Sequence, residues 1–110
     1  MSTRIVPILR VADAAASVEW YAQLGFERVF EHRFEEGLPA YVGISRDGAE
    51  LHLSEHTGDA AGPALAYVWI DDLDALAERF GLVPDVMPWA RDIEVTDPDG
   101  NRLRLAQAHD

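Results

Sequence analysis

The stretch "DGAELHLSE" (residues 47–55) indicates how this chain folds. Its Asp-Gly pair is typical of a tight turn between antiparallel strands, and the residues after the turn alternate between apolar and polar. Alternation along a strand places Leu51 and Leu53 on one face and His52 on the other. We therefore predict a hairpin with "AYVGIS" (40–45), which has one face in the core and one open face.

The same pattern returns fifty-two residues later, in "DGNRLRLAQ" (99–107). Asp47 corresponds to Asp99 (99 − 47 = 52), and at the same offset Leu51 corresponds to Leu103. Any two hairpins can share an Asp-Gly turn. Agreement over a strand, a capped helix and a hairpin favours an internal duplication instead.

Each half is expected to contain a strand, a helix and further strands. The predicted elements of the first half are a strand at 5–11, a helix from Asp13 to Gly25, a strand at 27–34 and the hairpin at 40–55. Those of the second half are a strand at 64–70, a helix at 71–81 that ends at Gly81, an irregular segment at 82–89 and a hairpin at 91–107. The order in the first module is β-α-β-β-β, and the second repeats this pattern with the irregular segment after its helix.

A half of about 50 residues is too short to bury a good core alone. We predict an α+β fold in which two tandem βαβββ modules form a curved mixed sheet, with a concave ligand cleft and helices on the outer face. The chain is expected to be one domain over 1–110, with module one at about 1–57, a linker at about 58–63 and module two at about 64–110.

Composition limits the possible functions. The net charge of −11, from 20 acidic and 9 basic residues, argues against nucleic acid and favours cationic small molecules. There is no long apolar run for a membrane span, no visible signal peptide and no cysteine. We expect a soluble cytoplasmic protein.

Histidines and carboxylates in the opening stretch raise the possibility of a metal site. His52 and His56 are four residues apart, which is about 13 Å along a straight strand, so the two rings cannot share one ion. Any further ligand must come from other strands. No phosphate-binding loop, HExxH motif or nucleophile elbow is present.

Aromatic residues are the more informative feature. Alternation places Tyr41, Tyr67 and Trp69 on the open face, and Trp89 lies in the irregular segment that would arch over the rim. Aromatic walls give contact area to flat ligands and attract cations to their faces. The alternative, that these rings are core residues, is favoured for Trp20 on the first predicted helix.

The chain resembles the vicinal-oxygen-chelate superfamily, which includes glyoxalase I, extradiol dioxygenases, fosfomycin-resistance enzymes and bleomycin-resistance proteins. The resemblance covers the whole chain and most closely suggests the bleomycin-resistance branch. It is most specific in "VPILRVADAAASVEWYAQLGF" (6–26), "LAYVWIDDLDAL" (65–76), "PWARDIEV" (88–95) and "DPDGNRLRLA" (97–106). The chain departs from that branch in "WARD" (89–92), where relatives usually carry Gly after the Trp and Glu after the Arg.

This resemblance also bears on metals and on the ligand. The four metal-ligand positions of the superfamily correspond here to Val6, His52, Leu65 and Arg104, of which only His52 can bind a metal. No metal, cofactor or catalytic residue is therefore expected. In the bleomycin-binding relatives, the residues matching Tyr67 and Trp89 stack on the drug, and those matching Phe30 and Tyr41 make further aromatic contacts. With the polar residues of the open face, the predicted ligand-binding residues are Phe30, Tyr41, Glu50, His52, Tyr67, Trp89, Asp92 and Glu94.

The resulting hypothesis is a non-enzymatic homodimer that sequesters a cationic planar antibiotic of the bleomycin type and so confers resistance. The dimer is implied by relatives that build their clefts between two chains. The main alternative is a divergent metal-dependent lyase, isomerase or dioxygenase of the same fold. A third is a regulatory or biosynthetic module that binds a metabolite.

Overall fold

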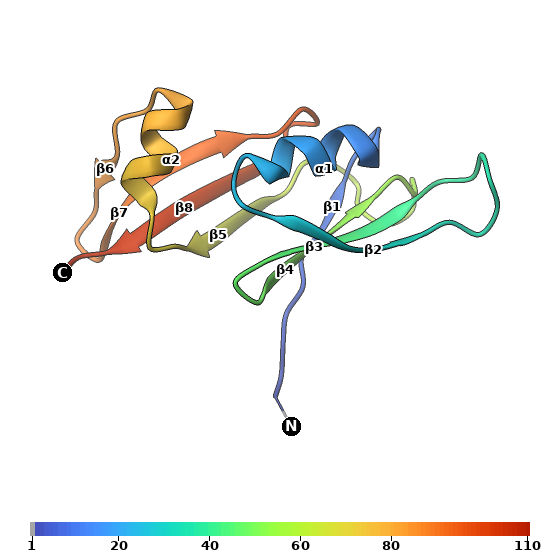
Figure 1. Ribbon diagram of the computed structural model, residues 1–110, viewed down its shortest axis with the longest axis horizontal. Helices are drawn as coiled ribbons and strands as arrows, with labels where there is room; N and C mark the ends of the chain where they lie inside the picture. Colours follow the sequence, from blue (N-terminus) through green and yellow to red (C-terminus); the bar gives the residue numbers. More distant parts are fainter. Residues whose placement is uncertain (1) are drawn as a thin grey trace. The chain divides into compact units, whose positions relative to one another are not determined.

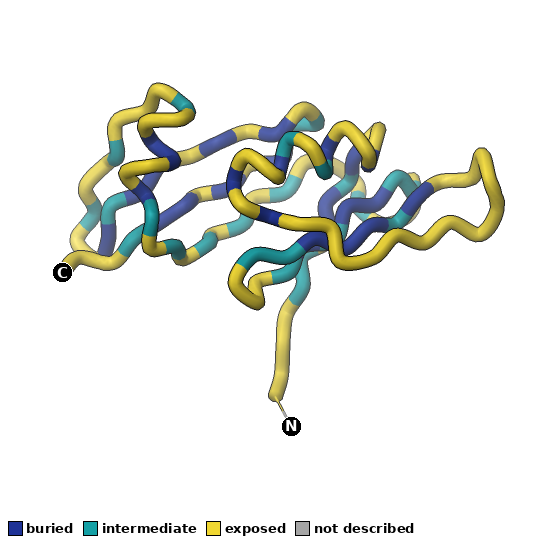
Figure 2. Tube along the Cα trace, in the orientation of Figure 1, coloured by how far each residue is buried: buried dark blue, intermediate teal, exposed yellow. Residues whose placement is uncertain are grey.

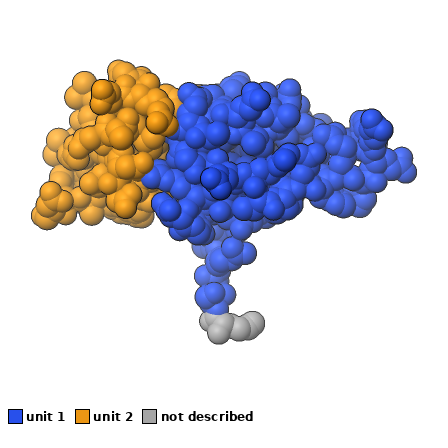
Figure 3. All heavy atoms as spheres, in the orientation of Figure 1, with its two compact units in different colours: residues 1–64, 97–101 blue, residues 65–96, 102–110 orange. Residues whose placement is uncertain are grey.

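The computed structural model describes residues 2–110 and divides the chain into two compact units. Unit 1 runs to Ala64 and also contains Asp97–Asn101; unit 2 consists of Leu65–Thr96 and Arg102–Asp110 (Figure 3). Each unit has its own sheet and its own helix.

Unit 1 contains one helix and a four-stranded mixed sheet (Figure 1). Its elements are β1 (Ile8–Arg10), α1 (Ala14–Ala22), β2 (Glu27–His32), β3 (Tyr41–Arg46) and β4 (Ala49–Ser54). The strand order is β1-β4-β3-β2; β1 is parallel to β4, and the other pairs are antiparallel. Helix α1 packs against β2, β3 and β4.

Local sequence explains the boundaries of these elements. The Asp13 carboxylate accepts a hydrogen bond from the Ala16 amide and so caps the start of α1. Asp47 and Gly48 both have positive φ, 49° and 85°, as a two-residue turn between twisted strands requires. The predicted helix cap and hairpin are confirmed.

Unit 2 repeats the same topology. Its elements are β5 (Leu65–Trp69), α2 (Leu73–Phe80), β6 (Asp85–Val86), β7 (Ala90–Thr96) and β8 (Arg102–Ala108). The order β5-β8-β7-β6, with β5 parallel to β8, matches unit 1 strand for strand. The α+β class and the internal duplication are therefore confirmed.

Strand β6 lies in the segment for which the sequence predicts no regular structure. It is only two residues long and follows Pro84, so neither alternation nor composition marks it. Only its pairing with β7, at Asp85 opposite Asp92 and Val86 opposite Arg91, defines it as a strand.

Leu51, Leu53, Leu103 and Leu105 are at most 4% exposed, so burial follows the predicted alternation along β4 and β8. Strand β2 is exposed along its whole length (Figure 2), and Val68, which alternation places opposite Tyr67 and Trp69, is half-buried. Neither helix in residues 2–110 combines the length and hydropathy needed to cross a membrane.

The turn between β7 and β8 belongs to unit 1, where it forms a buried polar network. Tyr21, fully buried on α1, donates its hydroxyl to Asp97 at 2.8 Å. Asp97 also accepts from the backbone amides of Asp99 and Asn101 and from the Asn101 side chain, at 2.8–3.0 Å. Burial and the adjacent Asp97 carboxylate hold the pKa of Tyr21 well above its usual range. The "DPDGN" motif thus anchors the start of β8 as well as making a turn.

Candidate ligand-binding site

Four of the predicted ligand-binding residues form one group in unit 1. The ring centroids of Phe30 and Tyr41 lie 5.2 and 5.1 Å from that of His52, both edge to face. Phe30 and Tyr41 are near-parallel to each other at 6.2 Å, and Glu50 is bonded to His52. We call Phe30, Tyr41, His52 and Glu50 the unit 1 cluster.

Glycine makes room for this cluster. Gly43 pairs with His52 on one side and with Phe30 on the other. A Cβ atom at Gly43 would lie 2.1 Å from Cε2 of Phe30, so the ring rests directly on the glycine backbone. A side chain at position 43 and the Phe30 ring therefore cannot occupy this space together.

We predict that Gly43→Ala displaces the exposed Phe30 ring and lowers the free energy of unfolding by about 1 kcal/mol, because the added methyl group takes the place of the ring. Gly58→Ala is the matched control, since a methyl group added there would have no atom within 4 Å. Urea denaturation of both variants measures the difference. Equal midpoints for the two variants would contradict the prediction.

Hydrogen bonds connect the polar members of the unit 1 cluster. Because a carboxylate can only accept, His52 donates from Nε2 to Glu50 at 2.5 Å, and in the neutral ring Nδ1 accepts from the Tyr41 hydroxyl at 2.7 Å. Glu50 also accepts from Arg4 at 3.2 Å. These hydrogen bonds lower the pKa of Glu50, and the one from His52 has the largest effect. The Glu50 charge is thus already paired within the protein.

The other four predicted residues line a cavity of about 450 Å³ in unit 2. Register explains their meeting, because Tyr67 pairs with Arg104 and Arg104 with Glu94 across three neighbouring strands. Asp92 lies two residues before Glu94 on β7 and on the same face of the strand. The complete lining is Tyr67, Asp85, Met87, Trp89, Asp92, Glu94 and Arg104.

A hydrogen bond holds the aromatic wall of this cavity. The Trp89 indole donates to the Tyr67 hydroxyl at 2.9 Å, although Trp89 lies in the connection before β7 and Tyr67 lies on β5. Trp69 packs edge to face on Tyr67 with centroids 5.3 Å apart but does not line the cavity. Trp89 and Trp69 are each 58% exposed, and Tyr67 is 41% exposed.

The two predicted carboxylates of the cavity differ in their partners. Glu94 is exposed and accepts from Arg104 at 3.1 Å and from Arg102 at 3.5 Å, and these arginines lower its pKa. Asp92 is only 7% exposed, and its side chain forms no hydrogen bond or ion pair within residues 2–110. Asp92 is therefore the carboxylate of this lining that is both largely buried and without a side-chain partner, and a cationic group would pair with it.

Sequence reasoning did not assign Asp85, Met87 or Arg104 to a ligand site. Arg104 alternates with Leu103 and Leu105, so the sequence did carry a signal that it faces the open side. Asp85 and Met87 lie in the segment predicted to be irregular, where no alternation of apolar and polar residues indicates which way a side chain points. With Asp85, the cavity has three carboxylates against one guanidinium, and its lining is net acidic.

The residues present do not fit a metal ion. Strand register places Ile8 beside His52 and Tyr67 beside Arg104, rather than Val6 and Leu65, the positions chosen from the resemblance. In unit 1 the aliphatic Ile8 adds no ligand to the imidazole of His52, and in unit 2 the phenol of Tyr67 and the guanidinium of Arg104 form no usual metal site. Within residues 2–110, no three His, Cys, Asp or Glu side chains gather closely enough to hold an ion.

Comparison with known proteins decides the family. The model of the family described as "Glyoxalase superfamily protein" matches residues 1–110. The chain belongs to the glyoxalase superfamily. A comparison with curated proteins gives no match.

Solved structures similar to this glyoxalase-superfamily chain include antibiotic-binding proteins. A bleomycin-binding protein in complex with bleomycin is 23% identical, with a TM-score of 0.74, over 98% of this chain and 100% of that one. A bleomycin resistance determinant encoded on transposon Tn5 is 24% identical, with a TM-score of 0.74, over 98% of this chain and 99% of that one. TnmS3, an antibiotic-binding protein from Streptomyces sp. CB03234, is 22% identical, with a TM-score of 0.78, over 99% of this chain and 98% of that one. Likeness at this level of identity establishes the shared fold.

Proposed function

We propose that this glyoxalase-superfamily chain binds and sequesters a cationic planar antibiotic of the bleomycin type, without a metal and without breaking a bond. The observation that carries the proposal is the unit 2 cavity, in which the unpaired Asp92 carboxylate shares a lining with Tyr67 and Trp89. A flat ring system would stack on the aromatic wall, and a protonated group would pair with Asp92.

The charge of the chain supports the same ligand class. With a net charge of −11, the protein attracts cations over long range, and the net acidic lining continues that attraction inside the cavity. Three proteins of similar fold are named for bleomycin or for antibiotic binding. Their names support an antibiotic ligand for this chain.

For the unit 1 cluster we propose a second set of ligand contacts. Phe30 and Tyr41 would offer aromatic surface, and His52 a polar contact. Glu50 contributes less charge attraction than the sequence implied, because it forms an ion pair with Arg4 and accepts a hydrogen bond from His52. As for the dimer, 13 large apolar side chains of residues 2–110 are exposed, among them Val29, Phe34 and Trp69. These surfaces support a homodimer, which sedimentation equilibrium would test.

Titration with metal-free bleomycin tests the proposed function. We expect quenching of tryptophan fluorescence with a dissociation constant of about 1 μM, which corresponds to about 8 kcal/mol of binding free energy. The ligand should be recovered chemically unchanged. Absence of saturable binding at this concentration would remove bleomycin as the ligand. Chemical conversion of the ligand would favour an enzymatic function over sequestration. So would a stoichiometric divalent ion in the wild-type protein that is absent from His52→Ala.

The stacking role of Trp89 has a matched control in Trp69, which is equally exposed on the same unit but lies outside the cavity lining. We expect Trp89→Ala to weaken binding about tenfold or more, because one wall of contact area is lost. Trp69→Ala should change affinity much less. Isothermal titration calorimetry measures both variants without relying on indole fluorescence, and wild-type affinity in Trp89→Ala would show that this ring does not stack on the ligand.

A further inference from the structure

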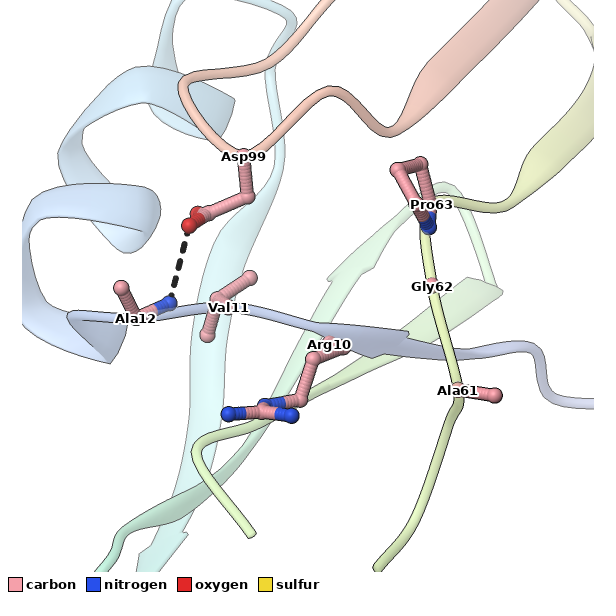
Figure 4. Close-up of a pocket in the computed structure, with 7 residues that line it drawn as sticks. All are labelled: Arg10, Val11, Ala12, Ala61, Gly62, Pro63 and Asp99. Carbon is pink, nitrogen blue, oxygen red and sulfur yellow. Dashed lines mark hydrogen bonds between the residues drawn. The ribbon is translucent and has the colours of Figure 1, made fainter. Parts of the chain in front are cut away.

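Unit 1 contains a separate cavity of about 200 Å³ that none of the predicted ligand-binding residues lines (Figure 4). Three segments distant in sequence meet there: the end of β1, the connection before β5, and the turn between β7 and β8. The lining residues are Arg10, Val11, Ala12, Ala61, Gly62, Pro63 and Asp99. Arg10 is the only cationic residue among them, and small side chains make up most of the rest.

The Arg10 side chain lacks partners. Its Nε atom is buried without a hydrogen-bond partner, and its guanidinium forms no ion pair within residues 2–110. At least seven of the chain's nine arginines do form ion pairs: Arg4, Arg28, Arg33, Arg46, Arg91, Arg102 and Arg104. A buried donor left unsatisfied costs free energy, and in so acidic a chain an unpaired arginine stands out.

Several other polar groups at this cavity are already engaged. Asp99 accepts from the Ala12 amide at 3.0 Å, and Figure 4 shows its carboxylate turned to that amide and not to Arg10. The Val11 amide donates to the Ser54 carbonyl at 2.9 Å, and the Arg10 carbonyl accepts from the Asn101 side chain at 2.9 Å. Of the two charged side chains in the lining, Asp99 is thus engaged, and the one left without a partner is the cationic donor Arg10.

We propose that this cavity binds a small organic carboxylate through Arg10. The planar guanidinium presents a fork of N–H donors that matches the two oxygens of a carboxylate. A carboxylate carries one negative charge, whereas a phosphate dianion would bring two charges into a lining that already contains Asp99. The site is independent of the proposed antibiotic site, because no residue is shared between the two cavities.

Nitrogen-detected or proton–nitrogen NMR of the Arg10 Nε–H tests the proposal in the full-length chain. With sodium propionate as the probe, we expect a saturable shift of this resonance and of the Ala12 and Gly62 amides. For so small a ligand the dissociation constant should be on the order of 1–10 mM. Sodium chloride at equal ionic strength should leave these resonances unshifted, and phosphate should bind several-fold more weakly than propionate.

Variants separate a built site from general attraction of anions. Arg10→Gln should weaken propionate binding at least tenfold, and Arg10→Lys severalfold, because a lysine keeps the charge but loses the fork. Arg28→Gln removes an exposed, ion-paired arginine of the same unit and should bind as wild type does. A non-saturating shift, an equal response to chloride, tighter binding of phosphate, or wild-type affinity in Arg10→Gln would each overturn the proposal. The wild-type titrations alone decide the matter if an Arg10 variant does not fold.

Discussion

Replacing Asp97 with alanine is expected to lower the free energy of unfolding by about 4 kcal/mol or more. The reason is the number of buried donors that lose their acceptor together. The Tyr21 hydroxyl, the Asn101 side chain and two backbone amides all donate to the Asp97 carboxylate, and Tyr21 and Asn101 are fully buried. Each orphaned donor costs about 1–3 kcal/mol when water cannot replace the lost partner.

Thermal and urea denaturation measure this loss, with Asp71→Ala as the matched control. Asp71 is exposed, so its replacement removes the same charge and should change stability by no more than about 0.5 kcal/mol. Asp97→Asn retains one carbonyl acceptor and should fall between the two. If Asp97→Ala unfolds at the same urea concentration as Asp71→Ala, the network does not contribute to stability in the way that its geometry implies.

Replacing Asp92 with asparagine is expected to weaken binding of a cationic planar ligand about 10- to 100-fold while leaving the free protein at least as stable. Binding suffers because the ligand's positive group loses its only unneutralised, buried counter-charge, an interaction worth about 1.5–3 kcal/mol. Stability does not suffer, because the Asp92 carboxylate forms no hydrogen bond or ion pair within residues 2–110. An asparagine of the same shape therefore removes no interaction of the unliganded protein.

Calorimetric titration with bleomycin, together with urea denaturation, gives both quantities. Asp74→Asn is the control for net charge, because Asp74 lies on α2, pairs with Arg91 and is exposed. That variant should bind the ligand nearly as tightly as wild type. A loss of affinity shared equally by both variants would reduce the role of Asp92 to long-range attraction. A large loss of stability in Asp92→Asn would mean that the carboxylate has a structural role instead.

Much of the fold could be predicted because its signals are local. The period-two pattern at Leu51 and Leu53, repeated at Leu103 and Leu105, identified the buried face of each sheet, and all four leucines are buried. The Asp-Gly turn, the Asp13 cap and the final Gly81 of α2 each depend on the φ, ψ and hydrogen bonds of a few neighbouring residues. Such patterns are complete within a short stretch of chain.

The candidate site could be predicted only in outline. Alternation correctly placed Asp92 and Glu94 on the same face of β7, but it treated them as equivalent carboxylates. Their difference arises from neighbours on other strands. The Arg104 side chain of β8 forms an ion pair with Glu94, whereas no side chain in residues 2–110 pairs with the Asp92 carboxylate. Strand β6 and Met87, which help to line the cavity, had no recognisable period in the sequence.

By itself the sequence determined the internal duplication, the buried face of β4 and of β8 and the net negative charge, because these follow from hydrophobic period, turn chemistry and composition. Tertiary structure alone decided which charges are neutralised and which are not. Tyr21 and Asp97 are 76 residues apart, and the lining of the Arg10 cavity comes from three separate segments. Whether a buried polar group has a partner depends on residues that only folding brings together, and no local pattern records it.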